Sequence, residues 1–122
     1  MKILGIDWGK KRIGLAVSEG SFAEPFGTVS SFEELKEVVR QEGISQAVLG
    51  LPEGKLEKEV REFGYRIENE IGIPVVFRSE VLTSRQALQK LIEAGRSLHS
   101  RRSLDARAAA LLLQEYLDIQ PD

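Results

Sequence analysis

The feature that most constrains this chain is a change of hydrophobic period near residue 30. Before it, two apolar runs, KILGIDWG and RIGLAVSE, alternate with other residues in the way typical of β-strands. Between them, Gly9-Lys10-Lys11 predicts a hairpin turn in which Gly9 takes a positive φ. A third strand is expected over residues 26–29, after the strand breaker Pro25. The first 30 residues therefore predict three sequential strands in antiparallel pairing.

After residue 30 the pattern alternates between helical stripes and short, continuous apolar runs, which indicate strands buried on both faces. Ser31 with Glu34 and Thr83 with Gln86 match capping boxes that begin helices. The expected helices and strands occupy, in chain order, residues 31–42, 46–51, 56–71, 74–77, 83–94 and 103–117. This order predicts an α/β fold in a single domain, 1–122: a mixed five-stranded sheet, three antiparallel strands then parallel crossovers, flanked by helices.

Composition excludes several classes of function. The 122 residues include no cysteine, which rules out disulfides, a thiol nucleophile and thiolate zinc sites. His99 is the single histidine, so histidine-rich metal sites and Ser-His-Asp catalysis are poorly supported. No apolar run approaches the roughly 20 residues that cross a bilayer, and the charged N-terminus does not match a signal peptide. We expect a cytoplasmic protein.

Three acidic residues stand out by position. Asp7 lies at the end of the first strand, Glu80 directly follows the last strand, and Asp105 opens the final helix. The two strand-end acids come together if the first and fourth strands are neighbours, and the start of the helix can then close over them. Three carboxylates suit Mg²⁺ or Mn²⁺, because hard cations prefer oxygen ligands. Two such ions would clamp a phosphodiester, one activating water and the other stabilising the leaving oxygen.

Each acid also has a purely structural interpretation. Asp7 can bond nearby amides in a turn. Glu80 can be a solvated loop residue. Asp105, in the first turn of its helix, can simply complement the helix dipole. Taken singly, each structural interpretation is the stronger one, and the convergence of all three on one edge of the sheet depends on the topology.

The overall net charge of −2 hides basic segments that could contact phosphates. Trp8, beside Asp7, could stack on a base or seal one face of the sheet, and His99 could be a general base or incidental. The candidate nucleic-acid-binding residues are those of the first hairpin and of the loop before Asp105: Lys10, Lys11, Arg12, Arg96, Arg101 and Arg102.

Four blocks of sequence resemble the YqgF (RuvX-like) family. They are GIDWGKKRIGLAVSE at 5–19, VLGLP at 48–52, SEVLTS at 79–84 and LDARAAALLLQEYL at 104–117, and they cover nearly the whole chain. Members are described as pre-16S rRNA nucleases and as Holliday-junction-resolvase-like proteins with an RNase H-like fold. The resemblance implies that Asp7, Glu80 and Asp105 are the catalytic, metal-binding acids.

The chain departs from the family pattern around Glu80, where DERL is usual and SEVLT stands here, and after Leu51-Pro52, where the loop is shorter.

From the three acids and the resemblance together, we expect a metal-dependent endonuclease, monomeric or homodimeric, that processes 16S rRNA precursor, with branched DNA as the alternative substrate. A non-catalytic nucleic-acid-binding or protein-binding module that kept the fold is the rival of another class. An ATPase lobe is a third hypothesis, although that fold needs two lobes and this length supplies one.

Overall fold

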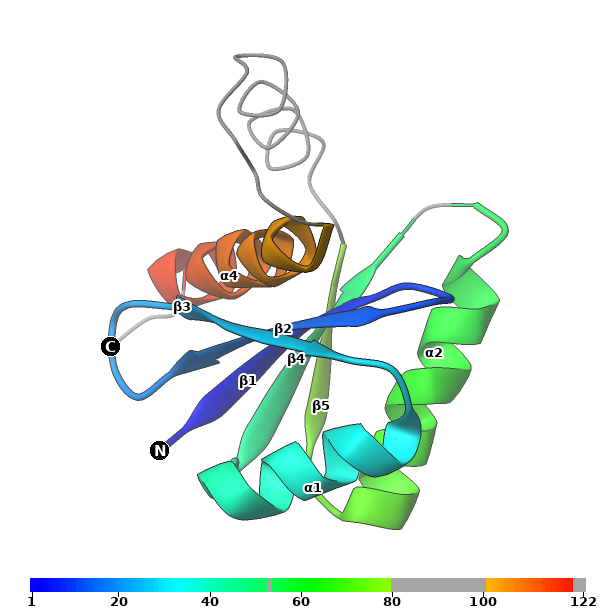
Figure 1. The fold of residues 1–122 in the computed structure, drawn as a ribbon, viewed down its shortest axis with the longest axis horizontal. Coiled ribbons are helices and arrows are strands. Elements are labelled where there is room, and N and C mark those ends of the chain that lie inside the picture. Colours follow the sequence, from blue (N-terminus) through cyan, green and yellow to red (C-terminus); the bar gives the residue numbers. More distant parts are fainter. Residues whose placement is uncertain (53, 80–100, 120–122) are drawn as a thin grey trace.

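In the computed structural model, which describes residues 1–52, 54–79 and 101–119, five strands form one mixed sheet (Figure 1). The order across the sheet is β3-β2-β1-β4-β5. The first three strands pair antiparallel, whereas β4 pairs parallel with both β1 and β5. The predicted mixed sheet is therefore confirmed, and its strands are β1 (Ile3–Trp8), β2 (Ile13–Ser18), β3 (Glu24–Val29), β4 (Gln46–Leu51) and β5 (Val75–Ser79).

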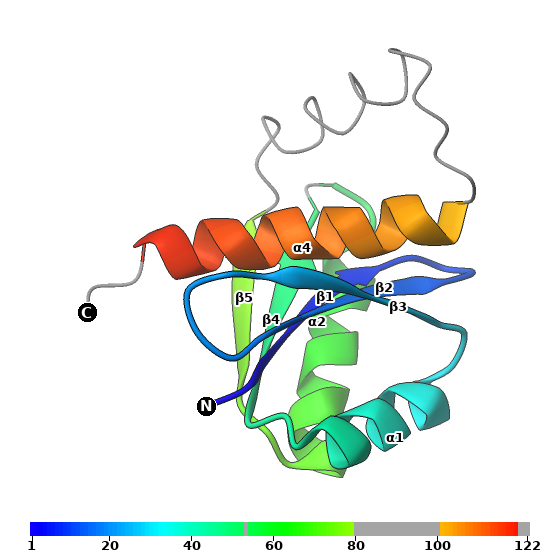
Figure 2. The same cartoon turned by 60° about the vertical axis from the view of Figure 1, so that its left-hand side comes forward.

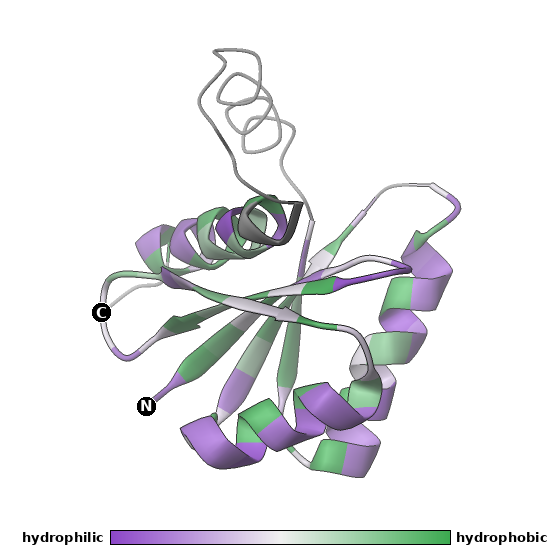
Figure 3. Ribbon diagram, viewed as in Figure 1, coloured by the Kyte–Doolittle hydropathy of each residue, from purple (hydrophilic) through white to green (hydrophobic). Residues whose placement is uncertain are grey.

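The helices cover the two faces of this sheet unequally. Among the described residues, helices α1 (Phe32–Glu42) and α2 (Glu57–Arg66) lie on one face, and α4 (Arg101–Ile119) lies on the other (Figure 2). Alternation along each strand divides the buried residues accordingly. Leu4 and Ile6 belong to the large core beneath α1 and α2, whereas Ala16 and Val48 pack with Leu113 of α4. Figure 3 shows green, hydrophobic segments along the central strands and alternating green and purple bands along α1 and α2.

The boundaries of α1 follow from its capping residues. The side chain of Ser31 accepts a hydrogen bond from the backbone N–H of Glu34, at 3.2 Å, and satisfies a donor that the helix leaves unpaired. At the other end Gly43 adopts a left-handed conformation, with φ of 66°, which residues with a β-carbon rarely adopt. Both signals were readable in the sequence, and the predicted helix is confirmed.

Three local expectations are wrong. Gly9 does not have a positive φ; an added β-carbon there would lie 2.7 Å from the carbonyl oxygen of Arg12, so close backbone approach requires the glycine. Pro25 lies inside β3, because an edge strand tolerates a residue without an N–H. The helix after β4 does not stay α-helical to its end. It changes to a π-helical segment, η1 (Ile67–Ile71), before Gly72.

The expected helix over 83–94 lies outside the described residues. Within the described part of the chain, no helix is both long enough and apolar enough to cross a membrane.

Candidate active site

Asp7 lies near the carboxyl end of β1, in the middle of the sheet and on the α4 face. Gly5 marks this face, because a β-carbon on Gly5 would lie 2.8 Å from Cβ of Leu113 and 3.0 Å from the carbonyl oxygen of Ala109. Side chains two residues apart on a strand share a face, so Asp7 also points to the α4 side. The Asp7 side chain is half-buried there.

Asp105 reaches the same place from α4. Its contact point is Gly14, which pairs directly with Asp7 across the β1–β2 ladder. A β-carbon on Gly14 would overlap the carbonyl oxygen of Asp105 and lie 3.0 Å from its Cβ. The helix therefore occupies the space of the missing side chain. Since directly paired β-carbons are about 5 Å apart, the β-carbons of Asp7 and Asp105 lie within about 8 Å of each other.

The helix position of Asp105 differs from the expected one. α4 begins at Arg101 and not at Ser103, so Asp105 is beyond the first turn, which contains no acidic residue. A helix dipole acts mainly on charges within that turn. The dipole interpretation of Asp105 is therefore weakened.

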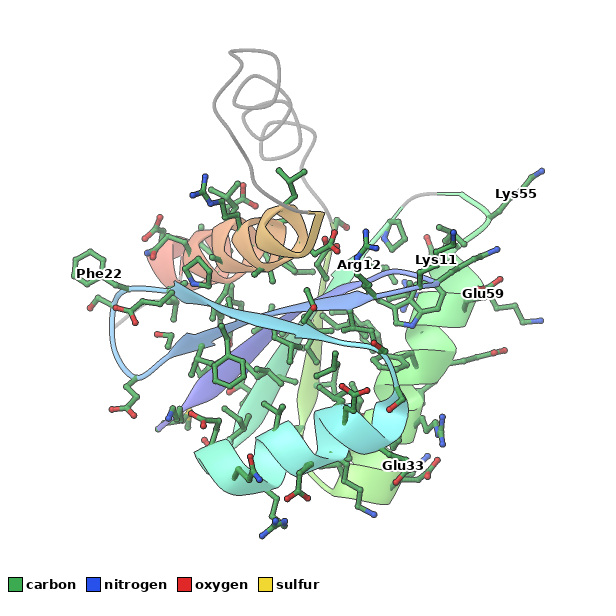
Figure 4. All side chains as sticks on the ribbon, in the orientation of Figure 1. Lys11, Arg12, Phe22, Glu33, Lys55 and Glu59 are labelled. Atoms are coloured by element: carbon green, nitrogen blue, oxygen red, sulfur yellow. The ribbon has the colours of Figure 1, made fainter. Side chains whose placement is uncertain are left out.

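Arg12 neutralises Asp105 in this structure. Its Nε donates to Oδ2 of Asp105 at 2.8 Å, and each side chain is 29% exposed. The contact joins the residue before β2 to the first part of α4, and Figure 4 shows Arg12 beside the start of that helix. Arg12 therefore lies at the carboxylate and not only at the hairpin tip, where Lys10 and Lys11 are exposed.

On the same face of the sheet as Asp7, the edge strand β5 carries an arginine, Arg78, that the sequence analysis did not select. The β1–β4 ladder ends at the Ile6–Leu49 pair, and the next residues along these parallel strands are Asp7 and Gly50. Gly50 pairs with Arg78 of β5. Neither glycine neighbour of Asp7 carries a side chain. Arg78 follows Val76 on the α4 face and is half-buried. An arginine that interrupts the apolar run of β5 was the available signal.

Arg78 faces Glu115 of α4. Burial raises the pKa of Glu115, and the charge of Asp118 adds to this, whereas the positive charge of Arg78 opposes it. Arg78 Nε and Glu115 Oε2 are both buried and have no hydrogen-bond partner among the described residues. The Nε of Arg78 is therefore buried, although the residue as a whole is half-buried, and it lies on the same face of the sheet as Asp7.

The remaining candidates separate clearly. Trp8 packs in the main core on the opposite face from Asp7, with its ring 6.3 Å from that of Phe63, which supports the structural interpretation and not base stacking. Arg101 and Arg102 form the start of α4. Glu80, Arg96 and His99 lie outside the described residues.

The described part of the chain contains no group of three histidine, cysteine or acidic residues that could hold a metal. It does contain two of the three expected acids, brought to one face by Gly14. Oxygen donors in a partly exposed position suit a hard divalent cation that keeps some of its water. The donor chemistry of Asp7 and Asp105 therefore fits Mg²⁺ or Mn²⁺.

Comparison with known proteins decides the family. The sequence model of RuvX, described as Holliday junction resolvase, matches residues 1–119. The chain belongs to the RuvX family. A Lactococcus lactis subsp. lactis relative named "Putative pre-16S rRNA nuclease" is 36% identical over 96% of this chain and 94% of its own length. A Moorella thermoacetica relative with the same name is 38% identical over 97% of this chain and 95% of its own.

Solved structures confirm the RNase H-like fold expected of a RuvX member. Thermus thermophilus RuvC, solved in complex with a Holliday junction substrate, superposes with a TM-score of 0.61 over 96% of this chain and 93% of its own, at 19% identity. Fowlpox virus resolvase, solved with Holliday junction DNA, gives 0.65 over 97% of each chain at 13% identity. At these identities the likeness concerns the fold.

Proposed function

We propose that this chain is a metal-dependent endonuclease that hydrolyses phosphodiester bonds in structured nucleic acid, most directly in processing the 5′ end of 16S rRNA precursor. The observation that carries the proposal is the seating of Asp105 over Gly14, the cross-strand partner of Asp7. This seating brings the β-carbons of the two acids to within about 8 Å on one face of the sheet, as a shared cation site would require. The names of the relatives support a nuclease and favour rRNA as the substrate.

Asp7, Asp105 and Glu80 would hold the ions in this proposal. Glu80 follows Ser79, the last residue of β5, in the sequence. β5 runs parallel to β4 and β4 to β1, so the carboxyl end of β5 lies at the same edge of the sheet as that of β1, which carries Asp7. Asp7 would be the central metal-binding residue, because β1 is the central strand. When bound, divalent ions supply an activated water and stabilise the leaving oxygen.

The basic residues of the site would bind and orient the substrate backbone. Arg12 can turn from Asp105 to a phosphate once a cation neutralises that carboxylate. Lys10 and Lys11, which are exposed at the hairpin tip, would add further positive charge for phosphate contacts. The segment of chain before Asp105 would supply further phosphate contacts, from Arg96, Arg101 and Arg102. Such contacts position the substrate and leave sequence selection to other features.

Branched DNA is the second candidate substrate. The RuvX description and the two resolvase structures solved with Holliday junctions favour it. A junction has two-fold symmetry, which would suit a homodimer.

The test is a cleavage assay with Mg²⁺ or Mn²⁺ that compares precursor rRNA ends with four-way DNA junctions. We expect the wild type to cleave the rRNA substrate, and Asp7→Asn to lose roughly 100-fold or more of the rate, because metal catalysis supplies several kcal/mol. The control is Glu33→Gln, an exposed acid of α1 on the opposite face, which should cleave normally. Preferred cleavage of junctions would select the second substrate. Equal cleavage by Asp7→Asn would contradict the proposed site.

A further inference from the structure

The end of the sheet opposite Asp7 carries an exposed aromatic surface that the nuclease function does not use. Phe22, in the loop between β2 and β3, is 78% exposed, and Phe26 of β3 is 45% exposed. Together with Pro25 they line a pocket of about 460 Å³. Figure 4 shows Phe22 at one end of the sheet and Arg12 and Lys11 at the other. The pocket is therefore separate from the candidate active site.

The loop holds Phe22 in place by hydrogen bonds on both of its sides. The side-chain amide of Gln114 in α4 accepts from the N–H of Ala23 at 2.8 Å and donates to the carbonyl of Ser21 at 2.9 Å. Before the tip, the buried hydroxyl of Ser18 bonds both backbone groups of Gly20. Because these hydrogen bonds fix the backbone on both sides of Phe22, little backbone freedom of the loop is lost when a partner covers the ring.

The charges around the pocket restrict its occupant. Three carboxylates line it, those of Glu19, Glu24 and Glu42. Lys2 is the one positive group of the lining, and its Nζ is already engaged by Glu42 at 3.0 Å and Glu19 at 3.4 Å. The surface therefore presents a negative rim around an apolar centre, with Glu24 exposed and unneutralised by Lys2.

A negative rim disfavours two of the possible occupants. Nucleic acid would bring phosphates against carboxylates. A second copy related by a two-fold axis would bring the same acidic rim against itself. A segment of another protein with apolar side chains between lysines or arginines satisfies both features. Its cations can pair with the rim and stack on the phenylalanine rings.

We propose that the Phe22–Phe26 surface, defined by Phe22, Pro25, Phe26 and the carboxylates of Glu19, Glu24 and Glu42, docks a basic, apolar segment of a protein partner. The surface lets the chain hold a protein at one end of the sheet while the Asp7 end stays open. It does not depend on the nuclease proposal, since none of its residues belongs to that site.

The test uses the full chain and a fluorescein-labelled synthetic peptide in which lysine and leucine alternate, with binding followed by fluorescence anisotropy. We expect the peptide to bind, and its counterpart with glutamate in place of lysine not to bind. Phe22→Ser should weaken binding about tenfold, as loss of an aromatic anchor does. Glu24→Lys should weaken it comparably, and added salt should weaken it further.

Matched controls come from other exposed positions. Tyr65→Ser on α2 and Glu33→Lys on α1 change the same residue classes far from the pocket and should leave peptide affinity unchanged. Phe22→Ser should also keep the Tm of the wild type, because the ring is exposed. If Phe22→Ser proves less stable than the wild type, Glu24→Lys tests the surface independently. Equal weakening by Glu24→Lys and Glu33→Lys would mean attraction to the overall charge and would overturn the proposal. Loss of self-association or of nucleic-acid binding in Phe22→Ser, with peptide binding unchanged, would overturn it in favour of another occupant.

Discussion

At the scale of single side chains, the ion pair between Arg12 and Asp105 has consequences for stability and for metal binding. The pair is about 70% shielded from solvent, so Arg12→Ala should lower the free energy of unfolding by about 1 kcal/mol without metal. In Mn²⁺ the same variant should show a larger rise in Tm than the wild type, because Arg12 no longer competes with the cation for Asp105. Thermal denaturation with and without Mn²⁺ measures both effects.

Arg12→Lys is the matched control for this prediction. It keeps the positive charge, so its Mn²⁺ increment should stay near that of the wild type. A smaller increment in Arg12→Ala than in the wild type would contradict competition and would mean that Arg12 instead orients Asp105 for the metal.

Glu115 predicts a dependence of stability on pH. Burial raises its pKa above the ordinary value of 4.5, and Asp118 adds to this while Arg78 opposes it. The folded chain therefore favours the protonated carboxyl, and this contribution is present below pH 4.5 and lost as pH rises through the raised pKa. Glu115→Gln should raise the Tm at pH 7 and leave it unchanged near pH 4. A lower Tm at pH 7 would mean that the Arg78 charge outweighs burial.

At the scale of secondary-structure elements, the approach of α4 to β2 depends on Gly14. A methyl group there meets the backbone carbonyl of Asp105, which cannot move aside as a side chain can. Gly14→Ala should lower the free energy of unfolding by about 2 kcal/mol and reduce cleavage, because the displaced helix carries Asp105 away from Asp7. The control is Gly20→Ala, which meets nothing within 4 Å and should change stability by less than about 0.5 kcal/mol. Equal stability of the two variants by urea denaturation would refute this close contact.

Elements with strong local signals were predictable, and those that depend on packing were not. The run QAVLGL gave β4 with its observed bounds, and Ser31 and Gly43 fixed the two ends of α1. Pro25 misled because its tolerance depends on β3 lying at the edge, which no local pattern reveals. The π-helical end of the segment before Gly72 has no sequence signal that we can name.

At the scale of the whole molecule, the sequence placed Asp7 near the end of the first strand, but the approach of Asp105 to Asp7 depends on the topology and the register. The topology puts β1 in the centre and the register pairs Asp7 with Gly14 of β2. The β1–β4 ladder ends at the Ile6–Leu49 pair, so the next residues along the two strands are Asp7 and Gly50. The proximity of those two glycines to Asp7 could be recognised only once the register was known, whereas Arg78 had a signal in the sequence as the charged residue in the apolar run of β5. Glu80, which lies outside the described residues, stays a prediction.

The central claim is that Asp7 and Asp105 together bind a divalent cation, and the Tm in Mn²⁺ tests it most directly. An ion that binds only the folded carboxylates stabilises the fold by mass action, so the wild-type Tm should rise with Mn²⁺ concentration. Asp7→Asn and Asp105→Asn should each lose most of that rise, whereas Glu33→Gln should keep it. Asp7→Asn could also be more stable than the wild type without metal, because it relieves repulsion between carboxylates. A rise in Asp7→Asn as large as that of the wild type would contradict the account.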